Sequence, residues 1–383
     1  MIRFLDAGES HGKALIAIIE GLPAGLKIDS DFINRQLLLR QSGYGRGGRQ
    51  KIEKDRVEFL SGVRFGETIG SPIAILIKNR DFENWRDIME PFAEKSRQRR
   101  VNRPRPGHAD LTGYLKYDRD DIRDILERSS ARETAIRVAV GSICELLLKE
   151  LGVRIISFVR SIGKIKTEIK PEVNDEFERK IIDSLVFCPD KKVEDLMIAE
   201  IEEAKKEGDT LGGVVEVVAS GVVAGVGSYV QWDRRLDARV SFSLMSIQAV
   251  KAVEIGDGFE NAYKFGSQVH DEIVYDSGYK RVSNRAGGIE GGMSNGEDIV
   301  VRAYMKPIPT LRKGLKSVNI DTHEEDISAF ERSDVTAVPS LSIVARSVVA
   351  FELANLYAEK FGGDTLKELK ERVEAYKKYL SVK

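Results

Sequence analysis

The chain has 383 residues, of which 42% are hydrophobic and 32% are charged, a balance typical of a globular protein long enough to bury a sizeable core. Its formal net charge is −1, so overall charge indicates neither a nucleic-acid nor a membrane partner. The two cysteines, Cys144 and Cys188, favour a reducing, cytoplasmic environment over a disulfide framework. Acidic residues within 1–11 argue against a signal peptide. No membrane span is expected, because Arg346 and Glu352 interrupt the longest apolar stretch near the C-terminus.

The first third of the chain alternates short strand patterns with glycine-rich and basic turns. The predicted order is a strand over 2–5, a turn over 8–12, a strand over 14–20, a helix from Ser30 through Leu38, a glycine-rich basic segment over 40–50, a strand over 71–77 and a basic loop over 95–108. Ser30 is the expected N-cap, because its hydroxyl can accept from first-turn amides.

The rest of the chain has longer helical patterns. They are expected over 130–151 and 193–206, followed by valine-rich strands within 212–225 and a closing helix over 364–380. Strands mixed with long helices predict an α/β or α+β fold.

An internal echo connects the two halves. Gly8–Gly25 is matched by Gly208–Gly225, and Glu127–Ser130 is matched by Glu331–Asp334. We favour a duplicated strand–helix unit as the explanation of this similarity. The alternative is a chance similarity between two glycine-rich segments. We therefore expect one domain, 1–383, with pseudo-repeats over about 1–160 and 205–362. His11 aligns with a leucine, so the turn is expected to be architectural and the histidine functional.

The turn sequence GESHG, Gly8–Gly12, resembles two familiar motifs. Its context excludes a phosphate loop and argues against a serine hydrolase, which stays open as a third interpretation with Ser10 as the nucleophile. A serine-hydrolase nucleophile elbow needs a sheet already begun, but only seven residues precede Gly8. A phosphate loop needs four residues between its glycines, and Ser or Thr after the lysine; here there are three, and Ala14 follows Lys13. The dinucleotide fingerprint within 43–48 follows a predicted helix where a strand is required.

Arginines in two loops instead indicate an anion site. Arg40, Arg46 and Arg49 lie among glycines, and further arginines lead to His108; guanidinium groups suit phosphate and carboxylate. A solvated loop or a nucleic-acid patch are the alternatives. The segment from Arg128 to Arg132 lies at a predicted helix start. Its serines and arginines either bind an anion or only cap the helix. His270 and His323 are expected to be surface residues.

Together these stretches resemble the chorismate synthase family. The resemblance rests on GESHGKALIAIIEGLP, ERSSARETAIRVAVGSI and RSDVTAVPSLSIVARSVVAFELA, with RQSGYGRGGRQ, RPGHAD, GGIEGGMSNG and KPIPT between them, and it runs from residue 1 to about 360. It implies a lyase that eliminates phosphate from 5-enolpyruvylshikimate 3-phosphate to form chorismate, and that needs reduced FMN. It also implies a β-α-β sandwich and a homotetramer. The rival interpretation is a protein that binds nucleic acid through its basic loops.

The resemblance also implies roles for individual residues. The catalytic set is His11, His108 and Asp334. His11 protonates the departing phosphate, His108 protonates or neutralises the reduced flavin near N1, and Asp334 acts with flavin N5 in ring-proton removal. The substrate set is Ser10, Arg40, Arg46, Arg49, Arg105 and Arg132. The flavin set is Arg128, Ser129, Ser130, Gln248, Ala249, Gly291, Lys306, Pro307, Ile308, Pro309, Thr310 and Arg332. No metal, nucleic-acid or membrane partner is expected. Reduced FMN is expected from an outside supply, with NADPH near Arg40 and Arg46 as the alternative.

Overall fold

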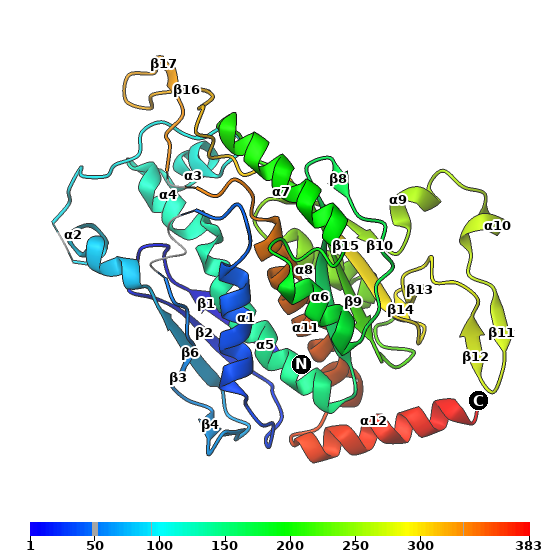
Figure 1. Ribbon diagram of the computed structural model, residues 1–383. Helices are drawn as coiled ribbons and strands as arrows, with labels where there is room; N and C mark the ends of the chain where they lie inside the picture. Colours follow the sequence, from blue (N-terminus) through cyan, green and yellow to red (C-terminus); the bar gives the residue numbers. More distant parts are fainter. Residues whose placement is uncertain (48–52, 93, 332) are drawn as a thin grey trace.

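Two antiparallel sheets enclose a layer of helices (Figure 1). The computed structural model describes residues 1–47, 53–92, 94–331 and 333–383. The first sheet has the order β1-β2-β6-β3. Its strands are β1 (Arg3–Ala7), β2 (Ala14–Glu20), β6 (Ile73–Lys78) and β3 (Glu58–Phe59). The inward side chains of β2 are buried while Ile16 and Ile18 face outward.

The second sheet has the order β10-β15-β9-β7-β8. Its strands are β7 (Arg154–Ile162), β8 (Ile165–Lys166), β9 (Gly213–Ser220), β10 (Val250–Ile255) and β15 (Ile299–Met305). Neighbouring strands in both sheets run antiparallel. Antiparallel sheets with a separate helical layer make this an α+β fold, and the expected β-α-β sandwich is present.

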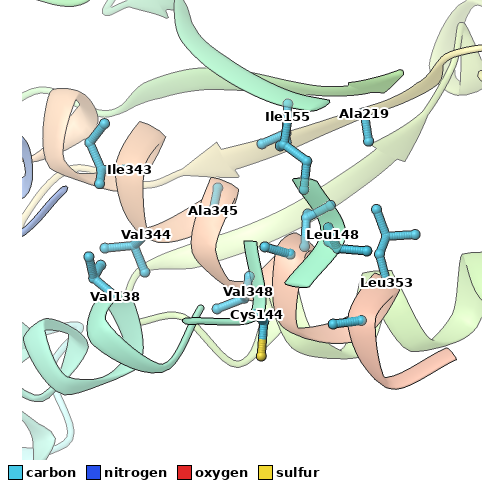
Figure 2. Close-up of a cluster of buried hydrophobic side chains, with 14 of the residues drawn as sticks. Val138, Cys144, Leu148, Ile155, Ala219, Ile343, Val344, Ala345, Val348 and Leu353 are labelled. Carbon is cyan, nitrogen blue, oxygen red and sulfur yellow. The ribbon is translucent and has the colours of Figure 1, made fainter. Parts of the chain in front are cut away.

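The central layer is dominated by α5 (Thr134–Glu150) and α11 (Val338–Phe361), which pack closely on each other. A Cβ added at Gly141 would lie 2.2 Å from the backbone oxygen of Ser347. Figure 2 shows side chains of both helices meeting those of the second sheet. Among the described residues, α11 alone is long and apolar enough to cross a membrane, but 89% of its apolar window is buried inside the protein. Its Arg346 pairs with Glu145 of α5 at 2.7 Å, so α11 is a core helix.

The remaining helices cover the sandwich and its ends. They are α1 (Ser30–Gln41), α2 (Arg86–Met89), α3 (Asp110–Tyr117), α4 (Ile122–Ser129), α6 (Asp175–Asp183), α7 (Lys191–Lys206), α8 (Leu236–Met245), α9 (Gly258–Asn261), α10 (Gly266–Val269) and α12 (Leu366–Ser381), with 3-10 turns η2 (Arg80–Asn84), η3 (Ala131–Glu133) and η4 (Trp232–Arg234). Short hairpins complete the fold: β4 (Val63–Arg64) with β5 (Glu67–Thr68), β11 (Ile273–Tyr275) with β12 (Tyr279–Arg281), β13 (Ile289–Glu290) with β14 (Met293–Ser294), and β16 (Lys316–Val318) with β17 (Glu325–Ile327). The expected Ser30 cap is wrong by one residue, because the Asp29 carboxylate accepts from the amide of Phe32.

The two sheets share a connection pattern. In each, an antiparallel run of three strands, β1-β2-β6 or β7-β9-β15, has the same order. The strand that follows each echo turn ends at a left-handed glycine, Gly21 with φ of 87° and Gly221 with φ of 79°. A Cβ would come within 2.1 Å of the Met1 oxygen at Gly21 and within 2.3 Å of the Gly152 oxygen at Gly221. The same steric requirement therefore operates at corresponding points of both sheets.

Candidate active site

The turn between β1 and β2 holds Ser10 and His11 against the end of α4. The Ser10 amide donates to the Glu127 carbonyl at 2.8 Å, and the His11 amide donates to the Glu127 carboxylate at 2.7 Å. The Ser10 and Ser130 hydroxyls are 3.1 Å apart. The structure thus brings together three residues that the sequence placed in different sets.

The His11 ring is confined on its face and its edges. Trp85 stacks on it with centroids 3.9 Å apart, and the guanidinium groups of Arg99 and Arg123 lie over the Trp85 ring. His11 Nε2 is 4.0 Å from an Asp81 oxygen. Only 11% of the imidazole is exposed. Sequence reasoning missed Trp85 and Asp81, because neither lies in a motif or at a spacing that connects it to His11.

Two arginines from the expected substrate set are buried at the start of α5. Arg132 donates to Asp55 at 2.6 Å and to Asn79. Arg40 donates to Thr134 at 3.0 Å and to the carbonyl of Ala131. These neutral and anionic partners, also missed from the sequence, hold the two guanidinium groups in fixed orientations.

Arg40 carries the clearest electrostatic sign of an anion site. Burial lowers its pKa from 12.5 to about 9, while Asp55 opposes the decrease and the charges of Arg132 and Arg46 add to it. Three guanidinium groups therefore converge, with Asp55, Glu53 and Asp334 as their counter-charges. An anion placed among them would relieve both the repulsion and the loss of hydration.

The second histidine lies in a separate buried cluster at the start of α3. Asp110 is fully buried; it accepts from Arg105 Nε at 2.8 Å and lies 2.5 Å from His108 Nδ1. Arg105 also donates to Thr310 at 2.9 Å. Other arginines of the basic loop do not join this cluster. Arg100, for example, pairs with Asp321 at 2.6 Å on the surface.

Asp110→Asn is expected to destabilise the protein by about 3 kcal/mol at pH 7, because it leaves Arg105 without its buried counter-charge. Burial raises the pKa of Asp110, but hydrogen bonds from His108 and Arg105 lower it well below its ordinary 3.8. The lowered pKa means that this stabilisation is complete above about pH 4 and is lost as the pH falls further. Urea unfolding at pH 7 and pH 3.5 should therefore show a smaller difference between variant and wild type at the lower pH. An equal difference at both would contradict this assignment.

Part of the expected flavin set adjoins this cluster. Lys306 donates its amide to the Ala249 carbonyl at 2.9 Å and its ammonium group to the Gly107 carbonyl. Gln248 donates to Glu133, next to the start of α5, at 3.2 Å. Ala249 has a φ of 67°, a conformation that a non-glycine residue holds only where its surroundings enforce it.

A cavity of about 660 Å³ opens beside Asp334. Its lining includes Arg46, Thr310, Asp334, Lys205, Arg312 and Phe330. Arg46 is 2.8 Å from one Asp334 oxygen, and the Gly47 amide donates to the other at 2.6 Å. Thr310 thus lies both on this cavity and beside Arg105.

The remaining expected residues have fewer contacts with the His11 and His108 clusters. Arg128 is half-exposed and pairs with Asp6 at 3.0 Å. Pro307–Pro309 connect the Lys306 and Thr310 positions, and Thr210 donates to the Ile308 carbonyl. Gly291 lies in the turn between β13 and β14, where an added Cβ would meet no atom within 4 Å. Arg49 and Arg332 lie outside the described residues. His270 and His323 are exposed, as predicted.

Comparison with known proteins decides the family. Residues 2–358 match the family model described as chorismate synthase. Chorismate synthases of Geobacter sulfurreducens and Desulforamulus reducens are 54% and 55% identical, with 99% of each chain covered. A solved structure titled "Crystal Structure of Chorismate Synthase" superposes with a TM-score of 0.81 at 44% identity, covering 100% of this chain and 99% of that one.

The chain belongs to the chorismate synthase family. The resemblance, the sandwich fold and the lyase class predicted from the sequence are thereby confirmed. The nucleic-acid alternative receives no support from any of these relatives. The roles of individual residues in this protein remain predictions.

Proposed function

We propose that this protein converts 5-enolpyruvylshikimate 3-phosphate to chorismate by a 1,4-anti elimination of phosphate, and that it requires reduced FMN. The observation that carries the proposal is the convergence of Arg40, Arg46 and Arg132 in a chain of this family. Arg132 is joined to the turn that holds His11 through Asn79, which donates to the Gly12 carbonyl. The substrate has one phosphate and two carboxylates, so it needs several fixed cationic donors. Arg105 would complete the set with Arg49 and Ser10.

His11 is the proposed general acid for the departing phosphate. Its ring is buried and fixed, and phosphate leaves more readily when it is protonated. Asp334 is the proposed acceptor of the ring proton. Both of its oxygens are held in this structure, by Arg46 and by the Gly47 amide. A substrate anion that binds Arg46 would leave Asp334 freer to accept a proton.

Unpartnered polar atoms among the expected flavin residues support a bound cofactor. Within the described part of the chain, Ser129 Oγ and Gln248 Oε1 are buried without a hydrogen-bond partner, and buried polar atoms are normally satisfied. The flavin would be held by these two with Arg128, Ser130, Ala249, Gly291, Lys306–Thr310 and Arg332, and His108 would stand beside it. Reduced FMN supplies transient electron density that eases phosphate departure. NADPH beside Arg40 and Arg46 is proposed as one source of reducing equivalents.

A cytoplasmic homotetramer is the proposed assembly, built from a duplicated unit in each chain. Leu5, Ile16 and Ile18 form an exposed apolar surface on the first sheet, and Trp232 and Phe242 are 75% exposed elsewhere. Two separate surfaces of this kind suit a dimer of dimers. Light scattering that gives a monomer mass would contradict this assembly.

The activity is tested by an anaerobic assay. Purified protein with chemically reduced FMN and 5-enolpyruvylshikimate 3-phosphate should release phosphate and form chorismate in equal amounts. Omitting the flavin, or supplying it oxidised, should abolish both products. Failure to form either product with competent reduced flavin would overturn the proposed function.

A further inference from the structure

One carboxylate receives both hydrogen-bond donors of the catalytic histidine. The Glu127 carboxylate accepts from the His11 amide at 2.7 Å and lies 2.8 Å from the ring Nδ1. The Glu127 carbonyl also accepts from the Ser10 amide. A single residue of α4 therefore fixes both the turn and the imidazole that the turn carries.

The chemistry of this contact determines which ring nitrogen carries the mobile proton. Burial raises the pKa of Glu127, but the hydrogen bonds from His11 outweigh this, and its pKa lies below the ordinary value. An ionised carboxylate only accepts hydrogen bonds. Nδ1 must therefore donate, and Nε2 is the nitrogen that can gain or lose a proton.

Among the described residues, Glu127 is the hydrogen-bond partner that the structure gives to the His11 ring at Nδ1. Trp85 contacts the face of the ring, and Asp81 lies 4.0 Å from Nε2, beyond hydrogen-bonding distance. Arg123 is 3.6 Å from Glu127 and 2.7 Å from Glu331, so it bridges the two glutamates that correspond in the internal echo. Glu331 shares the arginine with Glu127.

We propose that Glu127 is a positioning residue that locks His11 as the Nδ1–H tautomer and directs Nε2 toward the departing phosphate. This inference rests on the proposed function for its consequence in catalysis. The tautomer itself is a property of the protein without substrate or flavin.

The first experiment observes the tautomer directly. Because the chain has only four histidines, ¹⁵N-imidazole labelling should give four ring systems, and loss of one in His11→Asn assigns it. In the neutral His11 ring, Nδ1 should carry the proton and Nε2 should be the bare nitrogen. A ring that keeps its proton on Nε2 would overturn the proposal, whether or not any variant folds.

The second experiment separates positioning from support of the fold. Glu127→Gln keeps the size of the side chain and removes its charge. Glu331→Gln is the matched control, because Glu331 pairs with the same arginine, Arg123. We expect Glu127→Gln to lower kcat by about 10²-fold, the low end for a general acid, with KM changed by less than about twofold. Glu127→Gln should also populate the Nε2–H tautomer of His11. Glu331→Gln should neither lower kcat nor change the tautomer.

The outcomes distinguish the proposed role of His11 from the proposed role of Glu127. If His11→Asn is fully active, the proposed role of the histidine fails. If His11→Asn is impaired but Glu127→Gln matches wild type in kcat and in tautomer, the Glu127 inference alone fails. Equal losses in Glu127→Gln and Glu331→Gln would show that the effect comes from Arg123.

Discussion

His11→Asn is expected to lower kcat for phosphate elimination by about 10²–10⁴-fold, the usual contribution of a positioned general acid. The asparagine amide can still donate to Glu127, so the turn between β1 and β2 should keep its shape. The amide cannot deliver a proton to a departing phosphate at neutral pH. Anaerobic initial rates at saturating substrate and reduced FMN measure the effect.

The matched control for this substitution is His270→Asn, which removes an exposed histidine and should leave kcat unchanged. Reduced FMN should bind His11→Asn about as tightly as wild type, because His11 is assigned to the phosphate. Normal turnover with weakened FMN binding would mean that His11 serves the flavin instead.

Gly141→Ala is expected to destabilise the protein by about 3 kcal/mol, the upper part of the usual range for overpacking. Gly141 lies where α5 contacts α11, and the added methyl group would be 2.2 Å from the Ser347 carbonyl oxygen. Backbone of a core helix cannot move aside locally, so the two helices must separate. Because α5 begins beside Arg132, activity should fall as well.

Equilibrium urea unfolding at fixed protein concentration measures this loss. Gly266→Ala is the control, because its new Cβ would meet only His270 side-chain atoms, at 3.5 Å or more. That substitution should change the free energy of unfolding by less than about 1 kcal/mol. A similarly small change in Gly141→Ala would contradict the close α5–α11 packing.

Local sequence signals predicted much of the fold, and their failures have physical reasons. The glycine positions after β2 and β9 were visible because few residues tolerate a left-handed φ next to another backbone. The sequence could not show which face of β2 is buried, because the strand has apolar residues on both faces. The pairing of β9 with β7 and β15 joins distant segments, which no local pattern specifies.

The site was predictable only where a motif carried it. His11, His108 and the clustered arginines stand out by rarity and clustering, so the sequence alone indicates them as candidates. Asp55 and Trp85 contact these residues only through the tertiary fold, and nothing in their local sequence indicates it. Glu127 could have been proposed from the sequence, since it directly precedes Arg128 in the ERSSARET motif.

The proposed reaction eliminates phosphate without consuming the flavin. The most direct test is an anaerobic reaction with reduced FMN at one tenth of the substrate concentration, followed by phosphate release, chorismate absorbance and flavin absorbance together. We expect complete conversion, one phosphate per chorismate, and flavin still reduced at the end. Product formation that stops after one equivalent of flavin has been oxidised would contradict it.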